Sequence, residues 1–234
     1  MTNKERFISL LNSTGREGID KLINFLEKTD FFTAPASTRF HSSYEGGLLQ
    51  HSLNVYDCLS NLGTMSHDGK LLEFYASGMR LDSIPKESII IVALLHDLCK
   101  TNFYAVEMRW RKDKNQNWEQ YPVYAVNDRN PYGHGEKSVM MASEFIHLTM
   151  QERYAIRWHM GMSEENNIQT YCQAAEKYPL VLFTHMADQM ATSYIETNTG
   201  NKKDEDVYLG SEPATVHAGD PEEFAEAEPI QQEV

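Results

Sequence analysis

The sequence predicts a mainly α-helical protein with one β-hairpin. Apolar residues recur at helical spacing over most of residues 1–196, and residues 89–95 form an uninterrupted apolar run. Residues 103–126 differ from the rest, because they combine aromatic and β-branched residues around a polar turn. At 234 residues the chain is also long enough to bury a substantial core.

The first part of the chain contains short helical patterns. Residues 4–12 and 17–28 are two amphipathic helix candidates, separated by Ser, Thr and Gly at 13–15. Residues 48–63 form a longer candidate with one apolar face. We expect a further short helix at 70–77.

The second part begins with the most apolar helix candidate. Pro85 suits the first turn of a helix over residues 86–99. The hairpin over 103–126, with its polar turn at 113–117, is expected to pack on or over the functional site. The remaining helix candidates are 135–147, 150–160, 168–177 and 180–197.

Acidic residues are concentrated at the C-terminal end. Residues 204–234 hold ten Asp and Glu and no Lys or Arg, out of 34 acidic and 21 basic residues in a chain of net charge -13. Few large apolar residues occur there, so we expect a disordered acidic tail over 199–234. We divide the rest into N-terminal helices (1–37) that pack on a core domain (38–198).

Composition also excludes several classes of protein. Residues 1–203 are close to neutral, which argues against a duplex nucleic-acid binder. The three scattered cysteines form neither a disulfide framework nor a zinc ribbon. The N-terminus lacks the features of a signal peptide, and the longest apolar run is far too short for a membrane span. We therefore expect a soluble cytoplasmic protein without a membrane partner, of unknown oligomeric state.

The His96-Asp97 doublet is the strongest functional signal. It directly follows the apolar run at 89–95, and a buried carboxylate beside an imidazole requires compensation. The alternative is an ion-paired or capping Asp, but the C-terminal turn of a helix disfavours a carboxylate. A divalent cation compensates both groups, so the doublet indicates a metal site.

Four more residues can complete this site. His51 lies on the apolar face of the helix at 48–63, His134 lies between two glycines, His159 ends a helix, and Asp188 follows an apolar segment. The three histidines have ordinary alternatives: a hydrogen-bonded core histidine, a loop histidine near a cap and a helix-end histidine, respectively. Their joint occurrence favours metal binding, which needs imidazole and carboxylate ligands on rigid elements.

This pattern resembles the HD superfamily of metal-dependent phosphohydrolases, whose motif runs H…HD…H…H…D. The match covers about residues 38–195, and the nearest similarity is to bacterial HD proteins of the 3′-to-5′ exoribonuclease group. The resemblance implies an HD-domain helical bundle. The matching segments are residues 46–55, residues 94–100 with the HD-x-x-K pattern, Gly133-His134-Gly135, His159-Met160-Gly161 and Met186-Ala187-Asp188.

The resemblance also implies roles for these residues. His51, His96, Asp97 and Asp188 would hold one divalent ion, while His134 and His159 mark a second ion bridged by Asp97. We favour two ions over one, and Mn, Fe, Co, Ni, Zn and Mg are not distinguished. Asp97 and Lys100 are the catalytic candidates. The phosphate-contact candidates, each with an ordinary surface residue as the alternative, are His41, Arg129 and Lys137.

The expected function is hydrolysis of a phosphoester or phosphoanhydride bond in a nucleotide-type substrate by a metal-activated water. A small nucleotide is favoured over a polynucleotide, because the body of the chain lacks net positive charge. Two alternatives stay open. One is a 3′-to-5′ exonuclease on RNA or single-stranded DNA, and the other is a non-catalytic nucleotide-binding module.

Overall fold

The computed structural model describes residues 1–163 and 167–196. The acidic tail expected over 199–234 lies outside the described residues. Within the described residues the chain forms eight α-helices and two small antiparallel sheets, so the prediction of a mainly α-helical protein is confirmed. None of the helices described is both long and apolar enough to cross a membrane.

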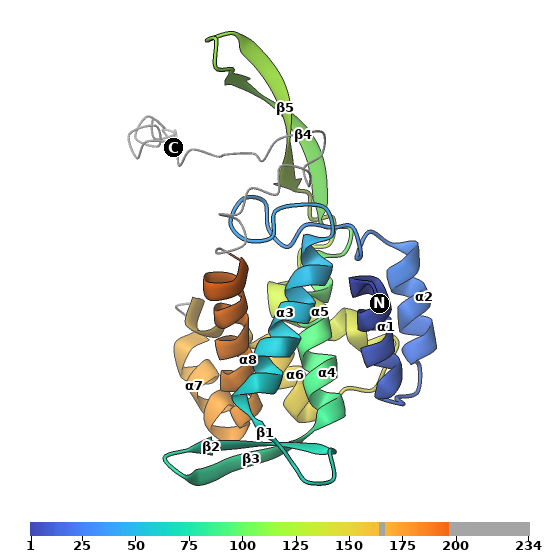
Figure 1. Ribbon diagram of the computed structural model, residues 1–234, viewed down its shortest axis with the longest axis vertical. Coiled ribbons are helices and arrows are strands. Elements are labelled where there is room, and N and C mark those ends of the chain that lie inside the picture. The colour runs from blue at the N-terminus through green and yellow to red at the C-terminus, as the bar shows by residue number, and fades with distance from the viewer. Residues whose placement is uncertain (164–166, 197–234) are drawn as a thin grey trace, which may run out of the picture.

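Five helices form the centre of the fold (Figure 1). Helix α3 (Gly47–Leu62) packs against α4 (Lys86–Leu95) and α8 (Pro179–Met190). Helix α6 (Met150–Arg157) contacts α4 and α8, and α5 (His134–Ser143) contacts α6. A helix that is apolar on all sides is stable only in a core, and every residue of α4 from 88 to 95 is buried.

Three further helices complete the bundle. Helices α1 (Asn3–Ser13) and α2 (Ile19–Lys28) lie close to the expected positions, and α1 contacts both α3 and α4. Phe7 and Leu22 are fully buried in the same apolar cluster as the central helices. Helix α7 (Ile168–Lys177) covers α8.

A three-stranded sheet lies at one end of the bundle, in a region where we expected a helix (Figure 1). Strands β1 (Thr64–Met65), β2 (Leu71–Ala76) and β3 (Met79–Pro85) pair in the order β1-β2-β3, all antiparallel. The expectation of a short helix at 70–77 is therefore wrong, and the hairpin at 103–126 is not the only β-structure.

The side chains of β2 explain the difference. Leu72 and Phe74 alternate with more exposed neighbours, which is the period of a strand and not of a helix. Leu72 pairs with Ile84 of β3. The ring of Phe74 stacks on Phe183 of α8 with centroids 4.2 Å apart. This short alternation buries one face of the strand against the bundle.

The expected hairpin is present at the opposite end of the bundle. Strands β4 (Tyr104–Lys112) and β5 (Trp118–Val126) pair from Tyr104 opposite Val126 to Lys112 opposite Trp118. The hairpin extends away from the helices (Figure 1), and Trp110 and Trp118 near its tip are exposed. Only its base approaches the bundle, where Tyr104 Oη donates to the carbonyl of Ala36 at 3.1 Å. Most of the hairpin therefore extends away from the bundle, contrary to the expectation that it packs on or over the functional site.

The chain turns sharply after α4. We expected one helix over 86–99, but α4 ends at Leu95 with His96 as its C-cap, and a 3-10 turn, η1, follows at Leu98–Lys100. Asp97 lies at the junction with φ −104° and ψ 20°. The Asp97 carboxylate therefore lies just beyond the end of α4, where the chain changes direction.

Candidate metal centre

Six side chains from separate parts of the chain converge in the interior. His51 comes from the second turn of α3, and Asp188 from α8. His96 and Asp97 follow α4, His134 is the first residue of α5, and His159 lies just beyond α6. Five of them are buried, while His134 has a side chain that is 31% exposed. The centre is therefore most open on the side of His134.

The first group of ligand atoms surrounds Nε2 of His51. This atom lies 3.2 Å from Nε2 of His96, 3.2 Å from Asp188 Oδ1 and 3.5 Å from Asp97 Oδ2. Nε2 of His96 is also 3.5 Å from Asp97 Oδ2. Two imidazole nitrogens and two carboxylates thus share one small volume.

The second group surrounds the other oxygen of Asp97. Asp97 Oδ1 lies 2.8 Å from Nε2 of His134 and 3.4 Å from Nε2 of His159. The carboxylate therefore belongs to both groups, with Oδ2 facing His51 and His96 and Oδ1 facing His134 and His159. A carboxylate can bridge two cations in this way, since each oxygen is a separate ligand.

Backbone carbonyls orient two of the imidazoles. Nδ1 of His96 donates to the carbonyl of Ala93 at 2.9 Å, and Nδ1 of His159 donates to that of Ile156 at 2.7 Å. Both carbonyls are in the last turn of a helix, where they lack helical partners. With the proton on Nδ1, the Nε2 lone pair of each ring points into the centre.

Glu196 orients His51, and we did not predict it. It ends the π-helical turn η4 (Ala191–Glu196) that continues α8, and its Oε1 accepts from Nδ1 of His51 at 2.8 Å. The same carboxylate accepts from Ser42 Oγ at 2.9 Å and Asn54 Nδ2 at 3.1 Å. The available signal was spacing, because Glu196 lies two helical turns after Asp188 in a segment expected to be helical.

The donor set fits a divalent cation. Nε2 of His159 is buried and has no hydrogen-bond partner among the described residues, and Nε2 of His51 and Nε2 of His96 lie 3.2 Å apart. Two imidazole nitrogens this close are unfavourable unless a proton or a metal cation lies between them. Imidazole and carboxylate ligands suit first-row divalent metals, so these buried groups could hold a metal ion.

The carboxylates attract positive charge strongly. Burial alone would lower the pKa of His51, but hydrogen bonds to Asp188 and Glu196 raise it to about 10. Burial would also lower the pKa of His134, but the hydrogen bond to Asp97 outweighs this and raises the pKa to about 9. A bound cation has to compete with these protons, because metal ligands must be deprotonated.

Lys100 lies against Asp97. Its Nζ is 2.7 Å from Asp97 Oδ2, and its side chain is 12% exposed. Burial disfavours both charges, yet the mutual attraction raises the pKa of Lys100 and lowers that of Asp97. Lys100 is therefore a fixed cation at the edge of the centre.

The three phosphate-contact candidates lie in different surroundings. The ring of His41 is 5.0 Å from that of His51, and burial, followed by repulsion from His51, lowers its pKa to about 4. Lys137 is buried and ion-paired with Asp128 at 2.5 Å. Arg129 is exposed in the loop before α5. Of the three, the structure brings only His41 next to the ligand groups.

Two glycines allow the backbone to place His134. Gly133 has φ +88°, and a Cβ on Gly135 would lie 2.2 Å from the carbonyl oxygen of Arg157. The start of α5 therefore touches the end of α6 directly, which brings His134 close to His159. Cys99 Sγ lies 3.1 Å from Nδ1 of His134 on its other side.

Comparison with protein families, curated proteins and solved structures finds no match to this chain. The site is therefore defined by its own geometry, as a buried cluster of imidazoles and carboxylates that could hold a metal ion.

Proposed function

We propose that the chain is an HD-type metal-dependent phosphohydrolase that cleaves a phosphoester or phosphoanhydride bond of a nucleotide-type substrate. The observation that supports this proposal best is the division of Asp97 between two ligand groups. A binuclear site is a common means of hydrolysing phosphate esters. The order of the residues along the chain also follows the H…HD…H…H…D pattern.

In this proposal two ions share the centre. His51, His96, Asp97 and Asp188 hold one, and His134 and His159 hold the other together with Asp97. When bound, the ions acidify a water molecule and offset charge on phosphoryl oxygens. Mn, Fe, Co, Ni and Zn all suit this donor set, and Mg is not excluded.

The residues around the ligands have supporting roles. Lys100 holds the Asp97 carboxylate with Nζ at 2.7 Å, and its partial exposure lets it contact a phosphoryl oxygen of a substrate. His41 lies next to His51, and its Nε2 has no hydrogen-bond partner within residues 1–163 and 167–196, so it offers a second polar contact. The opening beside His134 is the entry for the substrate. The free thiols Cys58, Cys99 and Cys172 make a cytoplasmic location part of the proposal.

The test combines metal analysis with a substrate panel. Elemental analysis of the purified chain should find about two ions per chain, in line with a binuclear site. Phosphate or nucleoside release from nucleoside mono-, di- and triphosphates and from p-nitrophenyl esters should require Mn²⁺ and stop after chelation. His96→Ala and Asp97→Ala should abolish turnover, whereas the exposed control His67→Ala should not. Full activity in both site variants would refute the proposal.

A second candidate function is 3′-to-5′ cleavage of single-stranded RNA or DNA. The observation that favours it is the exposure of Trp110 and Trp118, at 60% and 64%, near the tip of the hairpin with Lys112 beside them. Aromatic side chains stack on bases of single strands. Salt separates the two candidates, because strand cleavage should weaken steeply as salt rises while nucleotide hydrolysis should not.

A further inference from the structure

The hairpin of β4 and β5 carries apolar side chains on one of its two faces. Alternate residues of a strand share a face, and residues paired across the strands share it as well. By the register of the hairpin, the even-numbered residues of both strands form one face, which we call the apolar hairpin face. Among these residues, all within the described part of the chain, Lys112 alone is charged. The opposite face carries Glu107, Arg109, Arg111 and Glu119.

The apolar hairpin face is open to solvent over most of its length. The exposed fraction lies between 52% and 64% for Val106, Met108, Trp110, Trp118 and Val126. The hairpin extends away from the helices (Figure 1), so the bundle supports it only at its base. A two-stranded hairpin is marginally stable without a further layer, and a contiguous apolar patch of this kind is typical of an interaction surface.

A second copy of the hairpin fits this face when the two hairpins lie face to face and antiparallel. A twofold axis at Met108, the middle residue of β4, then places the two Met108 side chains opposite each other. The same axis places Trp110 opposite Val106 of the second copy, and Trp118 opposite its Val126. Each exposed apolar side chain therefore meets another one. The antiparallel direction also keeps the two helical bundles at opposite ends of the paired hairpins.

The charges at the two ends of the face favour the same arrangement. Lys112, near the tip, would lie over the base of the second hairpin. Exposed Glu45 is beside that base, because burial, followed by the charge of Glu45, raises the pKa of Tyr124 there. Opposite charges thus meet at both ends of the interface. A nucleic-acid strand fits less well, since its phosphates require positive charge along the whole face.

We propose that two copies of the chain associate through the apolar hairpin face, as an antiparallel dimer with Met108 on the twofold axis. Each strand has nine residues and spans about 30 Å at roughly 3.3 Å per residue. An interface of this length and of two strands' width is smaller than that of an obligate dimer. The dimer should therefore dissociate on dilution. Neither the metal centre nor the proposed hydrolase activity enters this inference.

Sedimentation equilibrium of the full chain over a range of concentrations tests the proposal. The average mass should rise from that of one chain towards that of two. Trp110→Glu places two carboxylates in the interface and should raise the dissociation constant at least about tenfold. Met79→Glu is the matched control, because Met79 is 66% exposed on β3 at the other end of the bundle and should not affect the dimer.

A charge exchange tests the direction of the two hairpins and does not alter the apolar residues. Lys112→Glu and Glu45→Lys should each weaken the dimer about fivefold, because each removes two ion pairs between the copies. The double variant should regain the dissociation constant of the unmodified chain. Weakening that is simply additive in the double variant would contradict the antiparallel arrangement.

Cross-linking locates the twofold axis. In a Cys172→Ser background, which removes the exposed thiol, Met108→Cys should form a covalent dimer with the short reagent bismaleimidoethane, whereas Met79→Cys should not. A chain that stays monomeric at all concentrations would overturn the proposal, as would a dimer that Trp110→Glu leaves intact. A monomer that loses oligouridylate binding on Trp110→Glu would assign the face to a nucleic-acid strand and overturn it as well.

Discussion

Glu196 Oε1 lies 2.8 Å from Nδ1 of His51, on the side of the ring away from the ligand groups. The carboxylate is buried and also accepts hydrogen bonds from Ser42 and Asn54. It therefore fixes both the tautomer and the orientation of an imidazole whose Nε2 faces Asp188. A carboxylate behind a histidine ligand commonly strengthens metal binding.

Glu196→Ala should reduce metal affinity roughly 10–100-fold, since it removes this support from His51. Glu196→Gln should lose less metal affinity, because the amide oxygen of Gln can still accept a hydrogen bond from Nδ1 of His51. Competition against a fluorescent chelator for Mn²⁺ or Zn²⁺ measures both. Glu144→Gln, on the surface after α5, is the control. Equal affinity in all four proteins would show that Glu196 does not support His51.

Lys100→Met should destabilise the chain in EDTA and be partly rescued by metal. Lys100 Nζ is 2.7 Å from Asp97 Oδ2, and removing one member of a buried pair costs about 3 kcal/mol. Added Mn²⁺ supplies positive charge to the same carboxylate. Urea unfolding of the variant, with and without Mn²⁺, measures the rescue against the unmodified chain. A variant as stable as the unmodified chain in EDTA contradicts this account.

The pair between Glu152 and Arg16 should stabilise the fold in a pH-dependent way. Glu152 is fully buried at the start of α6, and Arg16 Nη1 donates to its Oε2 at 2.7 Å. Burial would raise the pKa of Glu152, but the hydrogen bonds from Arg16, Ser88 and Thr149 outweigh it and lower the pKa. The pair therefore contributes its full stabilisation above the pKa of Glu152 in the unfolded chain, about 4.3. This stabilisation is lost as the pH falls through the lower pKa of Glu152 in the folded chain.

Glu152→Gln should therefore lower the free energy of unfolding by about 3 kcal/mol at pH 6. The difference from the unmodified chain should shrink below about pH 4.3, because Glu152 then binds a proton in the unfolded chain before it does so in the folded chain. Urea titrations between pH 6 and pH 3 provide the measurement, with exposed Glu176→Gln as the control. A difference that stays constant down to pH 3 rules out the ionic contribution.

Gly135→Ala should disturb the second ligand group selectively. The added Cβ would lie 2.2 Å from the carbonyl oxygen of Arg157, so α5 and α6 must separate, at a cost of about 1–3 kcal/mol. His134 moves with α5 and leaves Asp97. In the proposed binuclear enzyme, elemental analysis should then find one ion per chain and not two. Ser143→Ala, an exposed position at the end of α5, serves as the comparison. Unchanged stoichiometry would show that α5 tolerates the displacement.

The helices and the ligand cluster were predictable because both leave strong local patterns. The seven apolar residues 89–95 are expected in a hydrophobic core. The His-Asp pair that directly follows them is therefore expected to be buried as well. His51 and Asp188 similarly interrupt apolar faces of helices. Sequence reasoning therefore identified the residues that meet, whereas the sharing of Asp97 between two groups was expected only from the resemblance to the HD superfamily and not from the local pattern.

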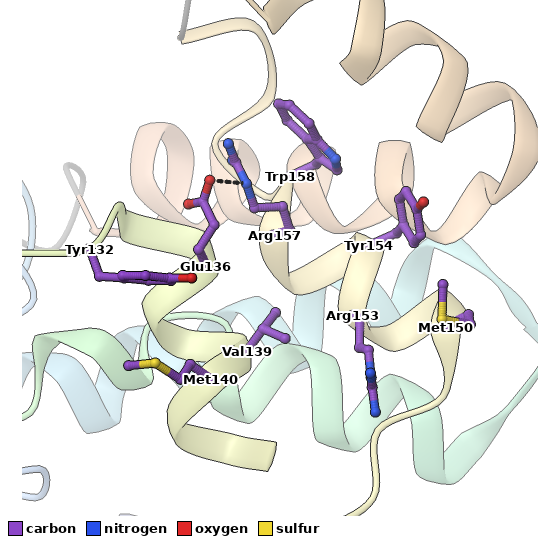
Figure 2. Close-up of a pocket in the computed structure, with 9 residues that line it drawn as sticks. All are labelled: Tyr132, Glu136, Val139, Met140, Met150, Arg153, Tyr154, Arg157 and Trp158. Atoms are coloured by element: carbon purple, nitrogen blue, oxygen red, sulfur yellow. Dashed lines mark ion pairs between the residues drawn. The ribbon is translucent and has the colours of Figure 1, made fainter. Parts of the chain in front are cut away.

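Other features depend on tertiary contacts that leave little local signal. The alternation in β2 is short, and its meaning is set by the contact of Phe74 with Phe183 on a distant helix. The role of Glu196 depends on an irregular π-helical turn that brings it back to His51. The position of Asp97 follows from the early end of α4, which helical periodicity does not locate. The groove between α5 and α6, which Glu136, Val139, Arg157 and Trp158 help to line (Figure 2), likewise arises only when the two helices pack.

The sharing of Asp97 has a consequence for how the centre fills. The two oxygens of Asp97 face different pairs of imidazoles. A cation bound in one ligand group would therefore change the charge and the orientation of the carboxylate that the other ligand group uses. Binding of the first metal ion would then change the affinity for the second, so two independent dissociation constants could not describe a metal titration. Loss of this single carboxylate would empty both halves together, whereas loss of His134 would leave the first half intact.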